Sequence, residues 1–483
     1  MSFTDRLSPG IVVQPKTAEE VQEIVQWANQ TLTPLVPVSS GPPHFRRDAF
    51  PSAAGGAAGA AAGATAGPAA GAVNGAVIVD LSGMKKVLRV DRRNRIAIIE
   101  PGLTYSELQP ILAKEGMRVS MPLMPRGNKS VIASMLEREP LVATKYQWSL
   151  MEPLRSMEVI WGDGSRFWTG EAGEYVQDLD EQQKINRSAV VGMGPGPVDY
   201  YRIISGAQGT MAIVTWASVK CEILPSAYES FFVPSDNLEN LIECLYDIVR
   251  IRFGDELFIV NGTELAMMMG RDPEEIEELK KTLPPWALFV SIAGRDYLPE
   301  EKIRYQKNDI EGIVRKHGFE MQTGLPGVEA GDLLDKLNGP EPGPWWKLRH
   351  KGASRDIFFM TTLDRAPAFA GTMLKASEGA NYDISDLGIY IQPQHQGAAC
   401  HCEFTIPYCP DDEAGEAVVK QLYEKASKEL FEQGAYYSRP YGIWADMVYG
   451  EDSQNTVLLK KVKDLFDPNH ILNPGKLCFP RTR

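Results

Sequence analysis

The chain has 483 residues, and its 50 basic against 63 acidic side chains give a formal net charge of −13 at pH 7. This length exceeds one ordinary hydrophobic core and predicts about two or three domains. Hydrophobic residues make up 43% and charged residues 23%, a globular balance that excludes a chain disordered throughout. The acidic excess argues against binding to nucleic acid or to anionic lipid.

The six cysteines are too few for a disulfide framework, and none lies in a CxxC motif. A zinc site or an iron–sulfur cluster within the chain is therefore not expected, and we predict no metal. The sequence shows no signal-peptide pattern at its start and no apolar run long enough to cross a bilayer. These features predict a soluble, cytoplasmic protein without a transmembrane segment.

The first predicted element is a helix from Thr17 to Asn29, where Thr17 and Glu20 form a capping box ahead of apolar residues at helical spacing. Short apolar strands flank this helix. The second strand ends abruptly in the turn-forming residues 39–44, Ser-Ser-Gly-Pro-Pro-His. The alanine- and glycine-rich residues 52–75 follow, and we interpret them as a surface insertion because such small side chains cannot build a core.

Apolar segments bounded by turn residues predict the next strands: 76–81, 87–90, 95–100, 157–168 and 212–224. The last of these is expected to be one long strand closed by Pro225. A different pattern begins there, because longer helices now alternate with strands such as 286–292. The predicted helices are 238–252, 272–281 and 300–317. We therefore expect the class α+β, with a domain boundary near residue 225.

Three segments, in this order, carry a family resemblance: residues 10–41, the glycine-containing segment 201–215, and the terminal stretch 466–476 with its Asn-Pro-Gly-Lys turn. Together they resemble the FAD-dependent oxidoreductases of the vanillyl-alcohol oxidase and p-cresol methylhydroxylase (PCMH) superfamily, which includes glycolate oxidase and D-lactate dehydrogenase flavoproteins. The resemblance implies FAD as cofactor and a two-subdomain FAD-binding domain of the PCMH type over 1–224. It further implies an antiparallel-sheet substrate cap over 225–440 and a return to the FAD domain over 441–483.

The resemblance also implies where FAD binds. Residues 39–41 match the loop whose amides approach the pyrophosphate, although Pro42 and Pro43 stand where glycines are usual and each removes one donor. His44 lies near the point at which a related branch attaches the flavin covalently, with an exposed loop histidine as the alternative. For residues 39–41 the alternative is an ordinary Pro-rich turn, and for residues 206–214 it is a simple turn before a core strand. The predicted cofactor residues are Ser39, Ser40, Gly41, His44, Ala133, Ser134, Gly206, Gly209, Thr210, Ile213, Val214 and Asn473.

A flavin supplies the redox chemistry, so the protein must hold the substrate, take up a proton and balance charge. Residues 401–406 alternate polar with apolar, which places His401, Glu403 and Thr405 on one face of a strand. An imidazole beside a carboxylate suits proton transfer, and His401 is the candidate base. The alternative is a strand with one solvated face.

In the 2-hydroxy-acid branch of the family, a related strand carries two histidines that bind a divalent metal. His395 and His401 are one residue short of that spacing and lack the acidic and glycine residues usual between them. Arg349 and Arg439 are candidate clamps for a carboxylate or a phenolate, with surface ion pairs as the alternative. Arg439 and its neighbouring tyrosines, among them Tyr441, resemble the cluster with which p-cresol-type enzymes hold a phenolate.

These features together predict an FAD-dependent dehydrogenase that oxidises a small 2-hydroxy acid, such as D-lactate or glycolate, by hydride transfer to the flavin. Two alternatives stay open: oxidation of a para-substituted phenol or aromatic alcohol, and a non-catalytic flavin-binding scaffold subunit. An electron-acceptor protein is expected as partner unless oxygen serves, and it would be an iron–sulfur protein, a cytochrome or an electron-transfer flavoprotein. A homo-oligomer and a hetero-oligomer both stay open.

Overall fold

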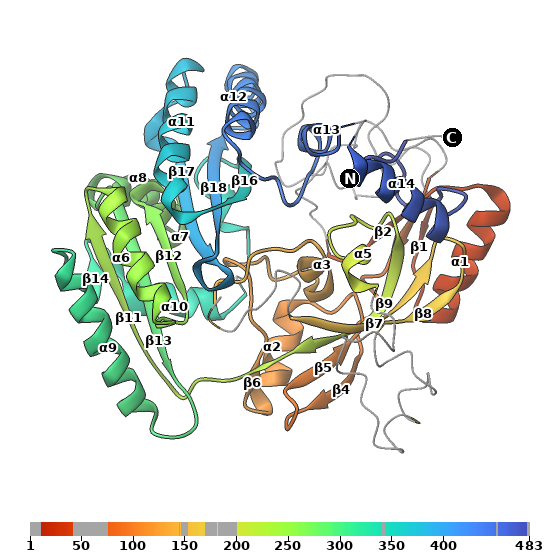
Figure 1. Cartoon of the computed structure of the whole chain (residues 1–483), viewed down its shortest axis with the longest axis horizontal. Helices are drawn as coiled ribbons and strands as arrows, with labels where there is room; N and C mark the ends of the chain where they lie inside the picture. Colours follow the sequence, from red (N-terminus) through yellow and green to blue (C-terminus); the bar gives the residue numbers. More distant parts are fainter. Residues whose placement is uncertain are drawn as a thin grey trace.

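Two lobes lie side by side in the computed structural model (Figure 1). One lobe holds the strands β1 to β10 and the other the strands β11 to β18. No helix of the described residues combines the length and the apolar character that a membrane span needs. The structure describes residues 11–41, 76–143, 145, 153–169, 181, 200–340, 343–450 and 453–480.

The first lobe contains a parallel three-stranded sheet, in the order β1-β3-β2, and an antiparallel five-stranded sheet, in the order β4-β5-β9-β7-β8. The predicted strand–helix–strand unit is present, but β1 and β2 each pair with β3 and not with one another. The strands are β1 (Val12–Val13), β2 (Leu35–Val38), β3 (Val77–Asp80), β4 (Val87–Asp91), β5 (Ile96–Ile99), β7 (Leu154–Trp161), β8 (Arg166–Trp168) and β9 (Ala212–Lys220).

Helices of this lobe begin where side chains cap them. In α1 (Ala18–Thr31), Thr17 Oγ1 accepts from the amide of Glu20 at 3.2 Å, while the Glu20 carboxylate accepts from the amide of Lys16 at 2.7 Å. The helix start predicted from the capping box is therefore confirmed, with the carboxylate bonded one residue earlier than the motif requires. The other helices are α2 (Tyr105–Lys114), α3 (Val131–Leu136) and α5 (Tyr201–Ile204).

The single strand predicted over 212–224 is wrong, because the chain changes sheets at Cys221. β9 ends at Lys220, and β10 (Glu222–Ile223) pairs instead with β6 (Met117–Arg118). Cys221 is wholly buried between them, and its amide donates to the carbonyl of Arg95 at 2.7 Å. The side-chain alternation continues through the break, so the local pattern carries no sign of it.

The second lobe is built on an antiparallel six-stranded sheet in the order β11-β13-β12-β17-β18-β16. Its strands are β11 (Ala227–Ser235), β12 (Leu257–Asn261), β13 (Trp286–Gly294), β16 (Ala353–Thr361), β17 (Gly388–Gln394) and β18 (Ala399–Tyr408). Apolar residues of one sheet face form the largest core with α6 (Leu238–Arg250), α9 (Pro299–Lys316), α11 (Ala366–Gly379) and α12 (Glu413–Glu432). The remaining elements are α7 (Gly262–Met269), α8 (Pro273–Thr282), α10 (Ala330–Asn338), β14 (Gly324–Leu325) and β15 (Val328–Glu329).

After α12 the chain returns to the first lobe, where α13 (Ile443–Val448) and α14 (Gln454–Phe466) lie in dark blue near the red and yellow elements of Figure 1. Phe466 stacks on Trp161 with ring centroids 4.1 Å apart. Beyond α14, the amide of Asn473 donates to the carbonyl of Leu35 in β2 at 2.8 Å. The C-terminal segment thus packs directly against the first strands of the chain.

Candidate active site

The polar face of the six-stranded sheet is set by the pairing of β17 with β18. Gln392 stands opposite His401, and Tyr390 stands opposite Glu403. Since side chains alternate along a strand, His401, Glu403 and Thr405 share one face, as predicted. The side chains between them point into the helix-covered core.

His401 is almost completely buried, at 2% exposure, and its Nε2 lies 2.8 Å from Oε2 of Glu403. Burial lowers the pKa of His401 below its usual value; Glu403 opposes this shift, while Arg439 and Lys347 add to it. A neutral imidazole that donates its Nε2 proton to a carboxylate carries its lone pair on Nδ1. No described residue is hydrogen-bonded to that Nδ1, so its lone pair is not taken up by a bond within the described part of the chain.

Lys347 is the central cation of this face, and the sequence analysis missed it. It lies on the short turn η4 (Trp346–Leu348), is 3% exposed, and its Nζ is bonded to Oε1 of Glu403 and lies 3.0 Å from Oδ2 of Asp356. Burial opposes the charge on the amine, but the surrounding carboxylates hold the pKa of Lys347 above its usual value. Burial likewise opposes ionisation of Glu403, but Lys347 and His401 hold the pKa of Glu403 well below its usual range.

Glu264 of α7 adds a third carboxyl group to the same place. Thr405 Oγ1 donates to Glu264 Oε1 at 3.2 Å. Complete burial raises the pKa of Glu264 to about 8; Lys347 opposes this shift, and Glu403 and Asp356 add to it. This raised pKa favours the neutral acid form of Glu264 at pH 7, beside the ionised Glu403 and the ammonium group of Lys347.

The two arginines predicted as anion clamps lie in different surroundings. Arg439 is 4% exposed, and its guanidinium carbon lies 3.9 Å from the centroid of the Phe358 ring, on the strand next to β18. Tyr441 packs edge-on against the same ring with centroids 6.4 Å apart. Arg349 instead donates to the carbonyl of Gly270 at 3.1 Å, just beyond the end of α7. Arg439 therefore packs on a ring that neighbours His401, whereas Arg349 is bonded near the end of α7.

Among the described residues, hydrogen bonds join the first lobe both to the polar face and to the segment that carries Arg439. Gln392 Nε2 donates to the carbonyl of Leu141, and Gln208 Nε2 donates to the carbonyl of Pro440 at 3.0 Å. Pro440 follows Arg439, and Gln208 lies in the turn between Gly206 and Thr210 that was predicted to bind the cofactor. The predicted cofactor turn of the first lobe thus contacts the segment that carries Arg439.

The loop after β2 offers free backbone donors. Ser40 Oγ accepts from the amide of Ser130 at 3.1 Å, and the amide of Gly41 donates to the carbonyl of Asn128 at 3.0 Å. Within the described ranges, the backbone amides of Ser39 and Ser40 donate no hydrogen bond. Converging amide donors of this kind fit a pyrophosphate. His44, predicted to follow this loop, lies outside the described residues.

The turn over residues 206–210 is packed tightly against β2 and the C-terminal turn. Gly209 has a φ of +70°, and a Cβ there would lie 2.7 Å from Cγ of Pro37. Asn473 Nδ2 donates to the carbonyl of Gln208 at 2.6 Å, while Asn473 Oδ1 is buried without a partner. A close backbone approach together with an unsatisfied acceptor fits a bound group that carries hydroxyl or amino donors, as FAD does.

The remaining predicted cofactor residues have protein partners. Ser134 Oγ donates to Glu139 Oε2 at 2.6 Å and accepts from the hydroxyl of Tyr105 at 3.1 Å, while Thr210 Oγ1 donates to the carbonyl of Ala207 at 2.7 Å. Ile213 and Val214 are apolar core residues of the first lobe, and Ala133 in α3 is half-buried. Their contact with FAD stays a prediction.

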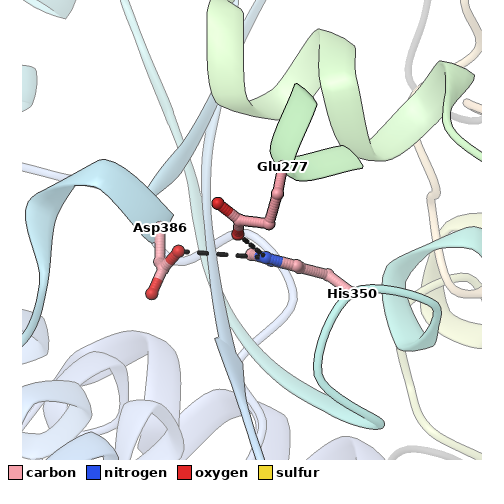
Figure 2. Close-up of side chains that lie close together, drawn as sticks. All are labelled: Glu277, His350 and Asp386. Atoms are coloured by element: carbon pink, nitrogen blue, oxygen red, sulfur yellow. Dashed lines mark hydrogen bonds and ion pairs between the residues drawn. The ribbon is translucent and has the colours of Figure 1, made fainter. Parts of the chain in front are cut away.

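A second cluster combines histidine, carboxylates and lysine at α8, and its donor set is one that could hold a metal ion (Figure 2). His350 Nε2 lies 2.6 Å from Oε1 of Glu277 and 3.9 Å from Oδ1 of Asp386. Lys280 Nζ already lies 2.9 Å from Glu277 and 2.6 Å from Asp386, and Lys351 also pairs with Asp386. A divalent cation would have to displace both ammonium groups, so we assign this cluster to structural ion pairing.

Two family comparisons match separate parts of the chain: residues 53–170 match the FAD binding domain, and residues 380–477 match the C-terminal domain of FAD linked oxidases. D-lactate dehydrogenase of Anaerostipes hadrus is 24% identical over 99% of this chain and 91% of its own length. D-2-hydroxyglutarate dehydrogenase of Stutzerimonas stutzeri is 23% identical over 97% and 91%, and glycolate oxidase subunit GlcD of Bacillus subtilis is 23% identical over 97% and 89%.

Solved structures with the same arrangement confirm the predicted fold class. The structure of p-cresol methylhydroxylase with substrate bound has a TM-score of 0.75 at 16% identity, over 97% of this chain and 88% of that one. The isoeugenol complex of 4-ethylphenol oxidase from Gulosibacter chungangensis has a TM-score of 0.75 at 18% identity, over 97% and 89%. At these identities the likeness concerns the fold alone.

Proposed function

We propose that this chain, which is an FAD-linked oxidoreductase with the FAD binding domain and the C-terminal domain of the FAD linked oxidases, oxidises a small 2-hydroxy acid to the 2-oxo acid. The observation that carries this proposal is the contact between Nε2 of His401 and Glu403 at 2.8 Å, with Arg439 packed over Phe358 of the adjacent strand. We assign a role in the reaction to each of these residues: His401, Glu403 and Arg439.

To become a 2-oxo acid, a 2-hydroxy acid must lose the proton of its hydroxyl group and a hydride from the carbon that bears this group. Nδ1 of His401 takes the proton, and Glu403 stabilises the imidazolium that forms. The guanidinium of Arg439 binds the substrate carboxylate, beside the apolar ring of Phe358. Bound FAD supplies the two-electron acceptor. The onward acceptor is proposed to be a partner protein (an iron–sulfur protein, a cytochrome or an electron-transfer flavoprotein) or oxygen.

The relatives favour this substrate class over others. Three of the relatives bear the names of a D-lactate dehydrogenase, a D-2-hydroxyglutarate dehydrogenase and a glycolate oxidase subunit, and all three names refer to 2-hydroxy acids. Their substrates share a carboxylate next to a secondary or primary alcohol. One arginine and one base are the recognition elements that such a substrate requires.

A para-substituted phenol is the second candidate. Arg439 lies among aromatic rings, with Tyr441 and Phe358 beside it, and a guanidinium in such surroundings also suits a phenolate. The structural likeness to p-cresol methylhydroxylase and 4-ethylphenol oxidase is compatible with this alternative. A flavin-binding scaffold without catalysis is the third candidate.

Anaerobic stopped-flow measurement of flavin bleaching distinguishes the three candidates. We expect D-lactate, glycolate or D-2-hydroxyglutarate to reduce the flavin, and His401→Asn to slow this step by about 10²–10⁴-fold. His317→Asn is the matched control, because His317 also bonds a carboxylate, Asp247 at 3.0 Å, but on the helix-covered side of the sheet. Reduction by phenols alone would favour the second candidate, and no reduction by any compound would favour the scaffold.

A further inference from the structure

We propose that Lys347 is the positioning residue of this site: it holds Glu403 ionised and in the one orientation that keeps the proton of His401 on Nε2 and leaves Nδ1 free for the substrate. The proposal rests on the proposed role of His401 as the base. Lys347 itself contacts neither substrate nor cofactor in this scheme, and it acts through Glu403.

The two oxygens of Glu403 have different partners. Oε1 is bonded to Lys347, and Oε2 lies 2.8 Å from Nε2 of His401. Because the lysine is anchored a second time, at 3.0 Å from Asp356, the carboxylate plane cannot rotate without breaking an ion pair. The ammonium also lies 5.5 Å and 5.3 Å from the ring centroids of Trp345 and Trp346, which wall it in.

The charge on Lys347 decides which group carries which proton. Groups from several elements face this cluster: Glu264 from α7, Asp356 from β16, Tyr390 from β17, His401 and Glu403 from β18, and Arg439 from the segment after α12. The ammonium of Lys347 contacts Glu403 and Asp356, and it is the main group that holds the pKa of Glu403 low. Without it, Glu403 would lose its bonded cation at a site with little water, and we expect its carboxylate to take up a proton.

A protonated Glu403 would reverse its hydrogen bond to His401. The carboxylic acid would donate to Nε2, and the neutral imidazole would then carry its proton on Nδ1. That tautomer presents a donor where the substrate hydroxyl needs an acceptor. An inverted tautomer in a Ser-His-Asp triad costs about 10⁴-fold in kcat, so we expect a loss of at least about 10²-fold here.

The test is Lys347→Met in the FAD-loaded protein, read by long-range ¹H–¹⁵N NMR of the histidine side chains. The signals of His401 are assigned by their absence in His401→Asn. We expect the Nε2–H pattern in the unsubstituted protein and the Nδ1–H pattern in Lys347→Met. In parallel, flavin reduction should fall by at least about 10²-fold with little change in KM, because the lysine does not contact the substrate.

Lys280→Met is the matched control, because Lys280 also pairs with a glutamate, Glu277, that bonds a histidine. Figure 2 shows that histidine, His350, beside Glu277. Lys280→Met should leave the tautomer of His401 and the rate of flavin reduction unchanged. If Lys347→Met does not fold, Lys347→Gln removes the same charge with a polar side chain and should give the same tautomer change, while Lys347→Arg should keep the Nε2–H pattern.

An unchanged Nε2–H pattern in the folded neutral variant would overturn the proposal. The tautomer measurement needs no substrate, so it stands apart from the proposed function. Full turnover in His401→Asn would reject the catalytic role of His401, whatever the tautomer in the Lys347 variants.

Discussion

Glu264→Gln should change how the stability of this protein depends on pH. Glu264 is wholly buried, and its pKa is raised from 4.5 to about 8 by that burial. The unfolded chain releases this proton near pH 4.5, whereas the folded protein keeps it up to about pH 8. The stabilisation from the protonated form is therefore complete below pH 4.5 and is lost progressively as the pH rises towards and through 8.

The size of the effect follows from the two pKa values. At about 1.4 kcal/mol per pH unit the gap sets an upper limit of about 5 kcal/mol. Between pH 5 and pH 9, linkage predicts that the unfolding free energy of the unsubstituted protein falls by about 4 kcal/mol through this group alone. Glutamine has nearly the same shape and does not titrate, so Glu264→Gln lacks this contribution.

Urea unfolding at fixed FAD concentration, repeated at pH 5, 7 and 9, measures the difference between the two proteins. We expect the glutamine variant to gain on the unsubstituted protein as the pH rises. Glu239→Gln, on an exposed position of α6, is the control for the chemical change alone. A difference between the two proteins that stays constant from pH 5 to pH 9 would refute the assignment of a neutral carboxyl group.

Three further substitutions test contacts between secondary-structure elements. Arg118→Met should lower the unfolding free energy by about 3–5 kcal/mol, because buried Glu256 loses the guanidinium that lies 3.0 Å from it. In urea unfolding, the double variant with Glu256→Gln should recover part of the lost stability. Additive losses from the two substitutions would contradict the expected coupling. Gly209→Ala should weaken FAD binding, since a Cβ at φ +70° would press on a proline of β2; an unchanged Kd in titrations of apoprotein with FAD would exclude this. Lys463→Met should lower Tm by several degrees, because buried Asp467 loses its cation. A Tm within about one degree of that of the unsubstituted protein would show that this ion pair does not contribute to stability.

Local patterns account for most of the secondary structure. The helix start at Thr17 follows from hydrogen bonds that form within one turn of chain, and the shared face of His401 and Glu403 follows from the two-residue repeat of a strand. The break at Cys221 does not follow from either rule. There the chain changes partner strands while its side-chain alternation continues, and strand pairing depends on what lies beside the strand.

From the amino-acid sequence by itself, the alternation of residues 401–406 gave the strand that carries the proposed base, because it depends on short-range spacing. The PCMH-type fold and FAD came from the resemblance of three segments to a known family, because such motifs are contiguous in the chain. Only the tertiary structure decided which cationic side chain is bonded to the carboxylate of that strand. Lys347 and Arg349 are two residues apart, yet the first is bonded to Glu403 and the second to a carbonyl beyond α7. Burial, which sets the protonation of Glu264 and His401, likewise arises only when helices and sheet close around them.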